Sequence, residues 1–181
     1  MTLLVRQPGL MTSLQDLGRP GHLAQGVPPS GALDCEGLML ANALAGNSLD
    51  KVALEMIGHG PKLKVEADSL RIALVGFVKV SLDGIPLAPW RSHLLRKGQL
   101  LKLGHVEMGH VAYLAVAGGF DGPLVLGSRS TYLRAGVGLK LEPGKTLATH
   151  LAGVTSGPLQ QIAVPSNWIC PSLRVVEGPE I

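Results

Sequence analysis

Short apolar runs separated by glycines and prolines dominate the hydrophobic pattern of this 181-residue chain. The runs are rich in leucine and valine and have the length of ordinary strands. The 24 glycines and 13 prolines fall between the runs, where they mark turns. We therefore expect a mainly β fold, with strands at Leu3–Arg6, Lys62–Val65, Leu70–Val75, Val78–Leu82, Leu94–Leu95, Leu100–Leu103, Ala112–Ala117 and Gln161–Val164.

Two local signals define individual elements. The pair Asp83-Gly84 stands between two strand-like segments, and both residue types tolerate positive φ, so it predicts a two-residue hairpin turn. From Asp34 to Leu44 the apolar residues recur at helical spacing, with Asp34 placed to cap the free amide groups. Gly46-Asn47 is a suitable C-terminal stop. We expect one prominent helix among the strands.

Composition and charge argue against a disordered protein, a nucleic-acid-binding protein and a membrane protein. Hydrophobic residues make up 46% of the chain and charged residues 16%, so extended disorder is not expected. The net charge is +3, and no basic run with interleaved aromatics is present, so nucleic acid is not an expected partner. No apolar stretch reaches the roughly 20 residues of a spanning helix, and the N-terminus does not have the pattern of a signal peptide. We expect a soluble, cytoplasmic protein with no membrane partner.

Metal and nucleotide motifs are also missing from the sequence. Cys35 and Cys170 form no CxxC pair, which suits a reducing cytoplasm and predicts neither a zinc knuckle nor a disulfide framework. The six histidines show no HxH or HExxH spacing, so no metal site is expected. No GxxxxGK[ST] loop occurs, and nucleotide binding by this chain alone is therefore not expected.

The stretch from Leu126 to Gly136 carries the strongest chemical signal. It sets two arginines, hydroxyl side chains and glycines between apolar runs, just after a strand-like run that ends in a Gly-Gly turn. Arginine meets carboxylate or phosphate bidentately, so the loop is a candidate anion clamp. Alternatively, its arginines pin the loop by binding carbonyls and acids. The candidate substrate- or anion-binding residues here are Arg129, Ser130, Thr131, Tyr132 and Arg134.

Three further residues are candidates for the same site. Arg19 sits in a glycine-rich turn that allows close approach to a ligand or partner, or it forms a salt bridge with Asp16. Ser30 precedes the helix as a candidate ligand donor, whereas Asp34 is better explained as its cap. Glu55 is an acid among apolar neighbours, which makes it a candidate general base or the partner of an arginine.

Several ordered segments together resemble one family. In chain order they are Gln15 to Gly21, Gly26 to Asp34, Ala41 to Asn47, Leu54-Glu55, Gly60-Pro61, Tyr113 to Gly119 and Leu126 to Gly136. These segments are similar to the N-terminal part of the C subunit of bacterial 5-oxoprolinase, from a family also called KipA-like, allophanate hydrolase subunit 2 or the biotin-dependent carboxyltransferase AB domain. The resemblance runs from about Val5 to about Gly136.

The resemblance implies a fold, partners and a cofactor. The fold is a cyclophilin-like β-barrel, the first of two tandem barrels in full-length relatives. The partners are the B subunit of 5-oxoprolinase, which is KipI-like, and the A subunit, with ATP bound in the complex with a partner and a small lactam or amide as substrate. Relatives fused in urea carboxylase pass a carboxyl group from biotin to urea, but biotin is not an expected cofactor of this chain.

Three departures from the family pattern qualify these expectations. We expect residues 1–165 to form the barrel and residues 166–181 to begin a second half that is otherwise absent, with its first strand in Leu173–Pro179. The segment Gly138–Gly144 is shorter than in the family and lacks its arginine. Phe77 stands where the family commonly has alanine, in a position expected to face a pocket.

Three functional interpretations follow. The first is a subunit of an ATP-dependent 5-oxoprolinase, which converts 5-oxoproline, ATP and water to glutamate, ADP and phosphate, and which is not catalytic alone. The second is a carboxyltransferase-like subunit of the urea carboxylase or allophanate type. The third is a KipA-like regulatory module or an inactive remnant. Unpaired strand edges at the end of the chain are also expected to favour a homo-oligomer.

Overall fold

The computed structural model describes residues 2–150, 158–165 and 168, and within them it has nine strands and one α-helix. The elements are β1 (Thr2–Gln7), β2 (Met11–Gln15), α1 (Cys35–Ala45), β3 (Ala53–Ile57), β4 (Lys62–Val65), β5 (Ser69–Leu82), β6 (Ile85–Leu87), β7 (Arg91–Arg96), β8 (Leu100–Val116) and β9 (Thr146–Ala148). The mainly β fold with one prominent helix is confirmed.

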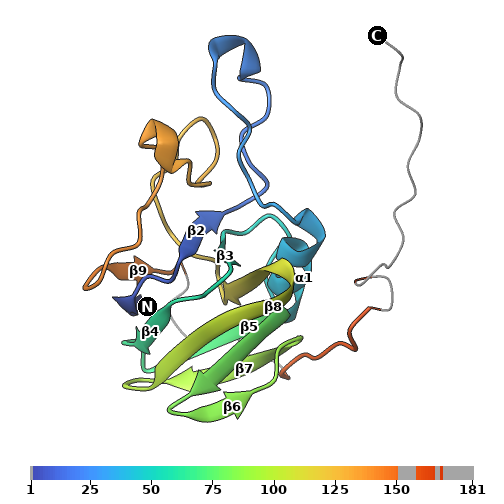
Figure 1. Cartoon of the computed structure of the whole chain (residues 1–181), viewed down its shortest axis with the longest axis vertical. Coiled ribbons are helices and arrows are strands. Elements are labelled where there is room, and N and C mark those ends of the chain that lie inside the picture. Colours follow the sequence, from blue (N-terminus) through green and yellow to red (C-terminus); the bar gives the residue numbers. More distant parts are fainter. Residues whose placement is uncertain (1, 151–157, 166–167, 169–181) are drawn as a thin grey trace.

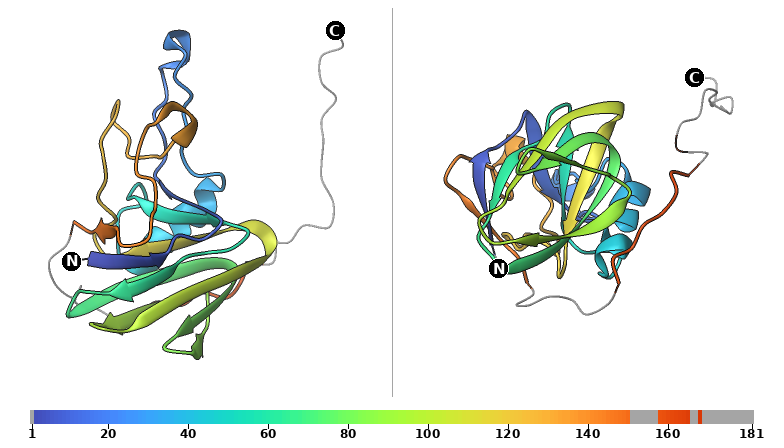
Figure 2. Two further views of the ribbon diagram at one scale, coloured as in Figure 1. Left: turned by 60° about the vertical axis from the view of Figure 1, so that its left-hand side comes forward. Right: turned by 90° about the horizontal axis from the view of Figure 1, so that it is seen from below.

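One antiparallel sheet contains all nine strands and curls on itself. Its main path is β2-β3-β8-β4-β1-β9, and β5 pairs with β6, β7 and β8. The long strand β8 connects the two parts of the sheet, since it pairs with β4 near its start, with β3 near its end and with β5 along much of its length. Seen from below, the strands curl round into a barrel-like arrangement (right panel of Figure 2; the strands are labelled in Figure 1).

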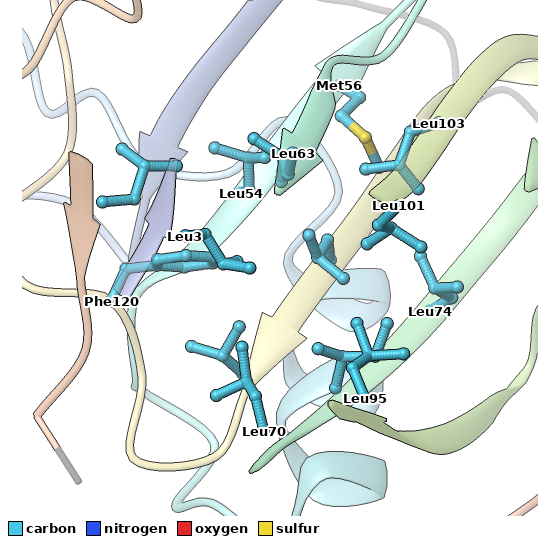
Figure 3. Packing of buried hydrophobic residues seen from close by; sticks show 14 of the residues in the cluster. Leu3, Leu54, Met56, Leu63, Leu70, Leu74, Leu95, Leu101, Leu103 and Phe120 are labelled. Carbon is cyan, nitrogen blue, oxygen red and sulfur yellow. The ribbon is translucent and has the colours of Figure 1, made fainter. Parts of the chain in front are cut away.

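The inside of the curled sheet is filled by aliphatic side chains. Leu3, Leu54 and Leu101 come from three different strands and are fully buried (Figure 3). Strand residues alternate between the two faces, so their neighbours point outward. Phe120, which follows β8, is also fully buried in this cluster. The inner face therefore provides the core, and polar chemistry is left to the outer face and the loops.

Helix α1 covers part of the outer face and has the ends that its sequence predicts. The Asp34 carboxylate accepts a hydrogen bond from the Gly37 amide at 3.0 Å, and Gly46 closes the helix in the left-handed conformation at φ 83°. Leu38 and Ala41 pack with Tyr113 on the outer face of β8. The helix thus fixes the surroundings of Tyr113, whose hydroxyl donates a hydrogen bond to Glu55 in the candidate functional site.

Most of the predicted strands are confirmed, and the errors have local causes. β4 has the predicted bounds, and the segments Leu70–Val75 and Val78–Leu82 merge into β5 through an irregularity at Gly76, where φ is 114°. The strand predicted at Gln161–Val164 is wrong, because that segment makes only an isolated bridge from Gln161 to Arg91. The strands β2, β3 and β9 were not predicted. The predicted strand in Leu173–Pro179 lies outside the described residues.

The predicted hairpin at Asp83-Gly84 is confirmed, with Leu82 paired to Ile85 across the turn. Both turn residues have positive φ, 51° for Asp83 and 86° for Gly84, and the Asp83 carboxylate accepts from the Leu100 amide at 2.8 Å. A Cβ at Gly84 would meet no atom within 4 Å, so the conformation alone limits substitution there.

We expect Gly84→Ala to lower the free energy of unfolding by about 1 kcal/mol, because alanine pays the steric cost of a left-handed backbone. Urea denaturation would measure the change. Gly84→Asn is the matched control, since asparagine visits this region readily and should lose clearly less. Equal losses for the two variants would show that the backbone conformation is not the cause.

Two long loops rise from the same end of the barrel. The first joins β2 to α1 and includes the 3₁₀ turn Leu23–Gln25, and the second joins β8 to β9 and includes the 3₁₀ turn Leu133–Ala135. Both extend beyond the sheet edge in Figure 1 and the left panel of Figure 2. The site residues predicted from sequence lie in these loops or in the strands beneath them.

Candidate functional site

A cavity of about 500 Å³ lies on the outer face of β2 and β3, beside the second loop. Leu14 and Leu54 point into the core, so Ser13 and Glu55, which alternate with them, point outward and face each other across the strand pair. We call this space the β2–β3 cavity. The polar side chains that line it belong to Thr12, Ser13, Gln15, Glu55, Thr131, Tyr132, Arg134 and Lys140.

Glu55 is the buried acid of this cavity and is only 6% exposed. Its Oε2 accepts hydrogen bonds from the Tyr113 hydroxyl and from the Leu33 amide, both at 2.7 Å. Burial raises the pKa of Glu55 above its ordinary value, and the two hydrogen bonds only partly oppose this effect. Glu55 pairs with no arginine among the described residues, where its partners are instead a tyrosine and a backbone amide.

Tyr113 connects Glu55 to the start of the helix. Its hydroxyl donates to Glu55 and accepts from the Asp34 amide at 2.8 Å. Burial, with the nearby Glu55 charge, raises the pKa of Tyr113, so the hydroxyl keeps its proton as a donor. The Glu55 carboxyl is consequently held in one orientation from the side of the helix.

Gln15 brings a second acceptor to the cavity. Its side-chain amide donates to the Ser13 hydroxyl at 2.9 Å and to the Thr131 carbonyl at 3.2 Å. These two bonds fix the side chain, and its buried Oε1 has no hydrogen-bond partner in the part of the chain that the structure describes. A buried polar atom without a partner costs free energy, so the Gln15 Oε1 favours a ligand with a complementary donor.

A cation stands at the edge of the cavity. Arg134 is exposed, lies in the turn Leu133–Ala135 and forms no ion pair with any described residue. The amide of Tyr132 donates to the Val137 carbonyl at 2.8 Å and so closes this turn. Lys140 also lines the cavity, but it is paired with Glu142 at 3.2 Å. Arg134 is therefore the cation that is available to an anionic group.

The loop that suggested an anion clamp binds a carboxylate of the protein itself. Asp16 accepts hydrogen bonds from the hydroxyls of Ser128 and Ser130, and from the amides of Gly18 and Arg129 at 2.8 and 2.7 Å. Burial raises the pKa of Asp16, but the four hydrogen bonds together outweigh it and leave the pKa below its ordinary value. The Ser130 hydroxyl is thus engaged within the protein.

Arg19 has a structural position at the base of the same loops. It is 2% exposed and donates to the carbonyls of Val125 and Ser130. It forms no salt bridge with Asp16, so that expected pairing is wrong. Arg19 instead holds the loops together by binding backbone carbonyls. The sequence analysis gave this structural role as an alternative for Arg129 and Arg134. Asp16 and Arg19 thereby join the first loop to the second.

Arg129 points to a smaller cavity of about 150 Å³ that it shares with Lys51 and His150. Its Nε lies 3.3 Å from the Asp121 carboxylate, which also lies 3.2 Å from the His150 ring. The guanidinium is therefore paired inside the protein. Arg129 and Arg134 face different spaces and do not form a single clamp.

The structure thus divides the predicted site residues into two sets. Those that line the β2–β3 cavity are Glu55, Thr131, Tyr132 and Arg134, and those outside its lining are Arg19, Ser30, Arg129 and Ser130. Ser30 has a positive φ of 55°, and its buried hydroxyl has no partner among the described residues. Phe77 does not face this cavity either, because its ring packs on Trp90 with centroids 5.6 Å apart.

Sequence reasoning missed Thr12, Ser13 and Gln15 as lining residues, together with the supporting Tyr113. The first three belong to β2, a strand whose single core residue, Leu14, leaves no clear alternation to detect. Tyr113 stands within an apolar run, where nothing in the sequence distinguishes it from a core residue. In the described part of the chain, no cluster of three or more metal-ligating side chains is found, and no helix has the length and apolar character needed to span a membrane.

Comparison with known proteins places these features in a family. The model of the carboxyltransferase domain, subdomain A and B, matches residues 25–181. The chain is 38% identical to the C subunit of 5-oxoprolinase from Escherichia coli over 138 residues, which cover 75% of this chain and 44% of that protein. It is 36% identical to urea amidolyase of Lachancea kluyveri over 135 residues, which cover 74% of this chain and 7% of that protein.

Solved structures agree with these sequence relationships. The crystal structure of TTHA0988 has a TM-score of 0.83 and 33% identity, and the match covers 91% of this chain and 62% of that one. Urea amidolyase of K. lactis has a TM-score of 0.80 and 36% identity, over 87% of this chain and 10% of that one. The chain spans about half the length of its 5-oxoprolinase relatives and a small part of the urea amidolyases. On the match over residues 25–181 and these relatives, the chain belongs to the family of the carboxyltransferase domain, subdomain A and B.

Proposed function

We propose that this chain forms the substrate-binding part of a C subunit of the 5-oxoprolinase type and holds a small lactam or amide in the β2–β3 cavity. The observation that carries the proposal is the combination of two buried acceptors, Glu55 and the unpartnered Gln15 Oε1, with the unpaired Arg134 at the edge. A lactam acid offers an N–H for the acceptors and a carboxylate for the arginine. Arginine recognises a carboxylate with two parallel hydrogen bonds.

Opening a lactam requires more than binding. Amide resonance makes the lactam carbonyl a poor electrophile, and transfer of a phosphoryl group from ATP to the lactam oxygen would remove that resonance. The sequence contains no phosphate-binding loop of the GxxxxGK[ST] type, so we propose that ATP binds together with the partner A and B subunits. In this proposal the chain orients the lactam, and turnover to glutamate, ADP and phosphate occurs only in the complex.

The second candidate is a urea-type substrate, because the urea amidolyase relatives are as similar to the chain as the 5-oxoprolinase subunits. Urea also presents N–H donors to Glu55 and Gln15, but it has no carboxylate. Arg134 therefore distinguishes the two substrates. A KipA-like regulatory role would instead require partner binding without turnover.

The experiment that tests the proposal is reconstitution. ATP-dependent conversion of 5-oxoproline to glutamate would be measured with the A and B subunits from the same source, with and without this chain. Activity that depends on the chain supports the proposal. Absence of activity despite stable binding to the B subunit would favour the regulatory interpretation, and activity of the chain alone would contradict the need for partners.

We expect Arg134→Ala to weaken 5-oxoproline binding by about tenfold, because one charge-assisted contact is lost. Binding of urea or a neutral lactam such as 2-pyrrolidinone should stay unchanged. Isothermal titration calorimetry with each ligand would measure this. Arg96→Ala is the control, since Arg96 is an exposed arginine on β7, outside the cavity lining. An equal loss for neutral and anionic ligands would contradict a carboxylate contact.

A further inference from the structure

A separate hollow of about 300 Å³ lies on the outer face of the barrel, where β5 and β8 meet the segment after β3. It shares no lining residue with the β2–β3 cavity. Its polar or small lining residues are His59, Lys79, Ser81, Lys102, Gly104 and His105. No Asp or Glu is among the lining residues of this basic hollow.

The strand register brings like charges together beside it. Lys102 on β8 is paired with Lys62 on β4 to one side and with Ser81 on β5 to the other. Directly opposed residues share a face of the sheet, and like charges in that position are destabilising. Neither Lys62 nor Lys102 forms an ion pair with any described residue. The protein thus keeps an unfavourable arrangement that an anion would relieve.

One nearby acid pairs with a lining lysine, whereas Lys102 and the adjacent Lys62 have no acidic partner among the described residues. Glu107 is occupied by Lys79 at 2.9 Å, and Glu66 lies 3.5 Å from Lys64. The His59 ring is fixed by a hydrogen bond between Nδ1 and the Gly60 carbonyl at 2.9 Å. At Gly104, a Cβ would approach the Lys79 carbonyl to 3.2 Å, so the glycine keeps the floor of the hollow open.

We propose that the basic hollow is a second ligand site, which binds the phosphate or diphosphate group of a small molecule. Lys102 lines the hollow without an ion pair, Lys62 lies directly opposite it, and Lys79 adds a charge that it shares with Glu107. Such a group matches an anion with more than one charge better than a single carboxylate. Lysine binds phosphate as a point charge, and the Ser81 hydroxyl adds a donor beside Lys102. This site is independent of the lactam or amide site proposed above.

Titration of the whole chain with sodium pyrophosphate tests the proposal, with calorimetry for affinity and proton NMR for the histidine rings. We expect saturable binding that shifts the ring signals of His59 and His105. Lys102→Ala should weaken binding by about tenfold, and Lys62→Ala should weaken it less. Lys97→Ala is the matched control, because this exposed lysine lies near Asp68 and away from the hollow.

Unfolding free energies of the lysine variants and the binding of an acidic peptide are two further readouts. Unfolding free energies of Lys102→Ala and Lys62→Ala should equal or exceed that of the parent chain, since each removes a like-charge contact. The proposal is overturned if pyrophosphate does not bind, if Lys97→Ala weakens binding as much as Lys102→Ala, or if an acidic peptide such as polyglutamate binds more tightly than pyrophosphate.

Discussion

Replacement of Asp16 by alanine is expected to lower the free energy of unfolding by about 3 kcal/mol, the largest stability effect that we predict for a loop residue. The substitution leaves the hydroxyls of Ser128 and Ser130 without their acceptor, and both serines are at most 1% exposed. The Arg129 amide loses its partner as well. Unsatisfied buried donors are costly because water cannot replace the lost acceptor.

Urea denaturation of Asp16→Ala, with Asp68→Ala as control, would measure this effect. Asp68 is an exposed acid whose lysine partner is 3.5 Å away, and such a pair is worth at most about 1 kcal/mol. The loss of unfolding free energy for Asp16→Asn should lie between those of Asp16→Ala and Asp68→Ala. The asparagine amide oxygen still accepts a hydrogen bond, but its NH₂ group is a donor that faces other donors. Similar losses for Asp16→Ala and Asp68→Ala would contradict the central place of Asp16 in the loops.

The pH dependence of stability provides a second readout for Asp16. Its pKa is lower in the folded protein than its ordinary value of 3.8, so the unfolded chain binds more protons in that range. The stabilisation is therefore present above pH 3.8 and is lost as the pH falls through the folded-state pKa. Asp16→Asn should lack this component of acid sensitivity, which denaturation series at several pH values below 5 would reveal.

Replacement of Glu55 by glutamine is expected to have the largest functional effect. We expect a loss of about 100-fold in the reconstituted activity, because glutamine cannot take a proton and presents a weaker acceptor. The fold should persist, since the glutamine oxygen can still accept from Tyr113 and from the Leu33 amide. Steady-state assays with the A and B subunits would separate an effect on turnover from one on KM.

Glu66→Gln is the matched control for this substitution, because Glu66 is an acid whose partner, Lys64, lies away from the cavity. It should leave the activity unchanged. Full activity of Glu55→Gln would contradict the assignment of Glu55 to the substrate site. A loss of activity accompanied by a large loss of stability would place its role in the fold instead.

The contribution of Glu55 to stability depends on pH in the opposite direction to that of Asp16. The folded-state pKa of Glu55 is raised above its ordinary value of 4.5, so the folded protein binds more protons than the unfolded chain in the range above that value. Stability is therefore lost as the pH rises from 4.5 through the folded-state pKa. Glu55→Gln should remove this decline, and its stability relative to the parent should improve with rising pH.

The sequence by itself determined the elements whose causes are local. Asp83-Gly84 makes a hairpin because two adjacent residues accept positive φ, and α1 begins at its Asp34 cap and ends at Gly46. Glycine- and proline-punctuated apolar runs indicated the mainly β class, and an ordered set of motifs indicated the family. Four of the cavity residues, Glu55, Thr131, Tyr132 and Arg134, were also named from sequence.

Only the tertiary structure decided which of these residues meet. Gln15 and Thr131 are 116 positions apart, and their contact depends on the path of the whole sheet and on Asp16 joining the two loops. Arg129 and Arg134 belong to one short loop but face different cavities. Asp121 forms an ion pair with Arg129, whereas Arg134 forms no ion pair with any described residue. Local propensity does not encode such pairings, since they arise from strand register and from burial shared between distant segments.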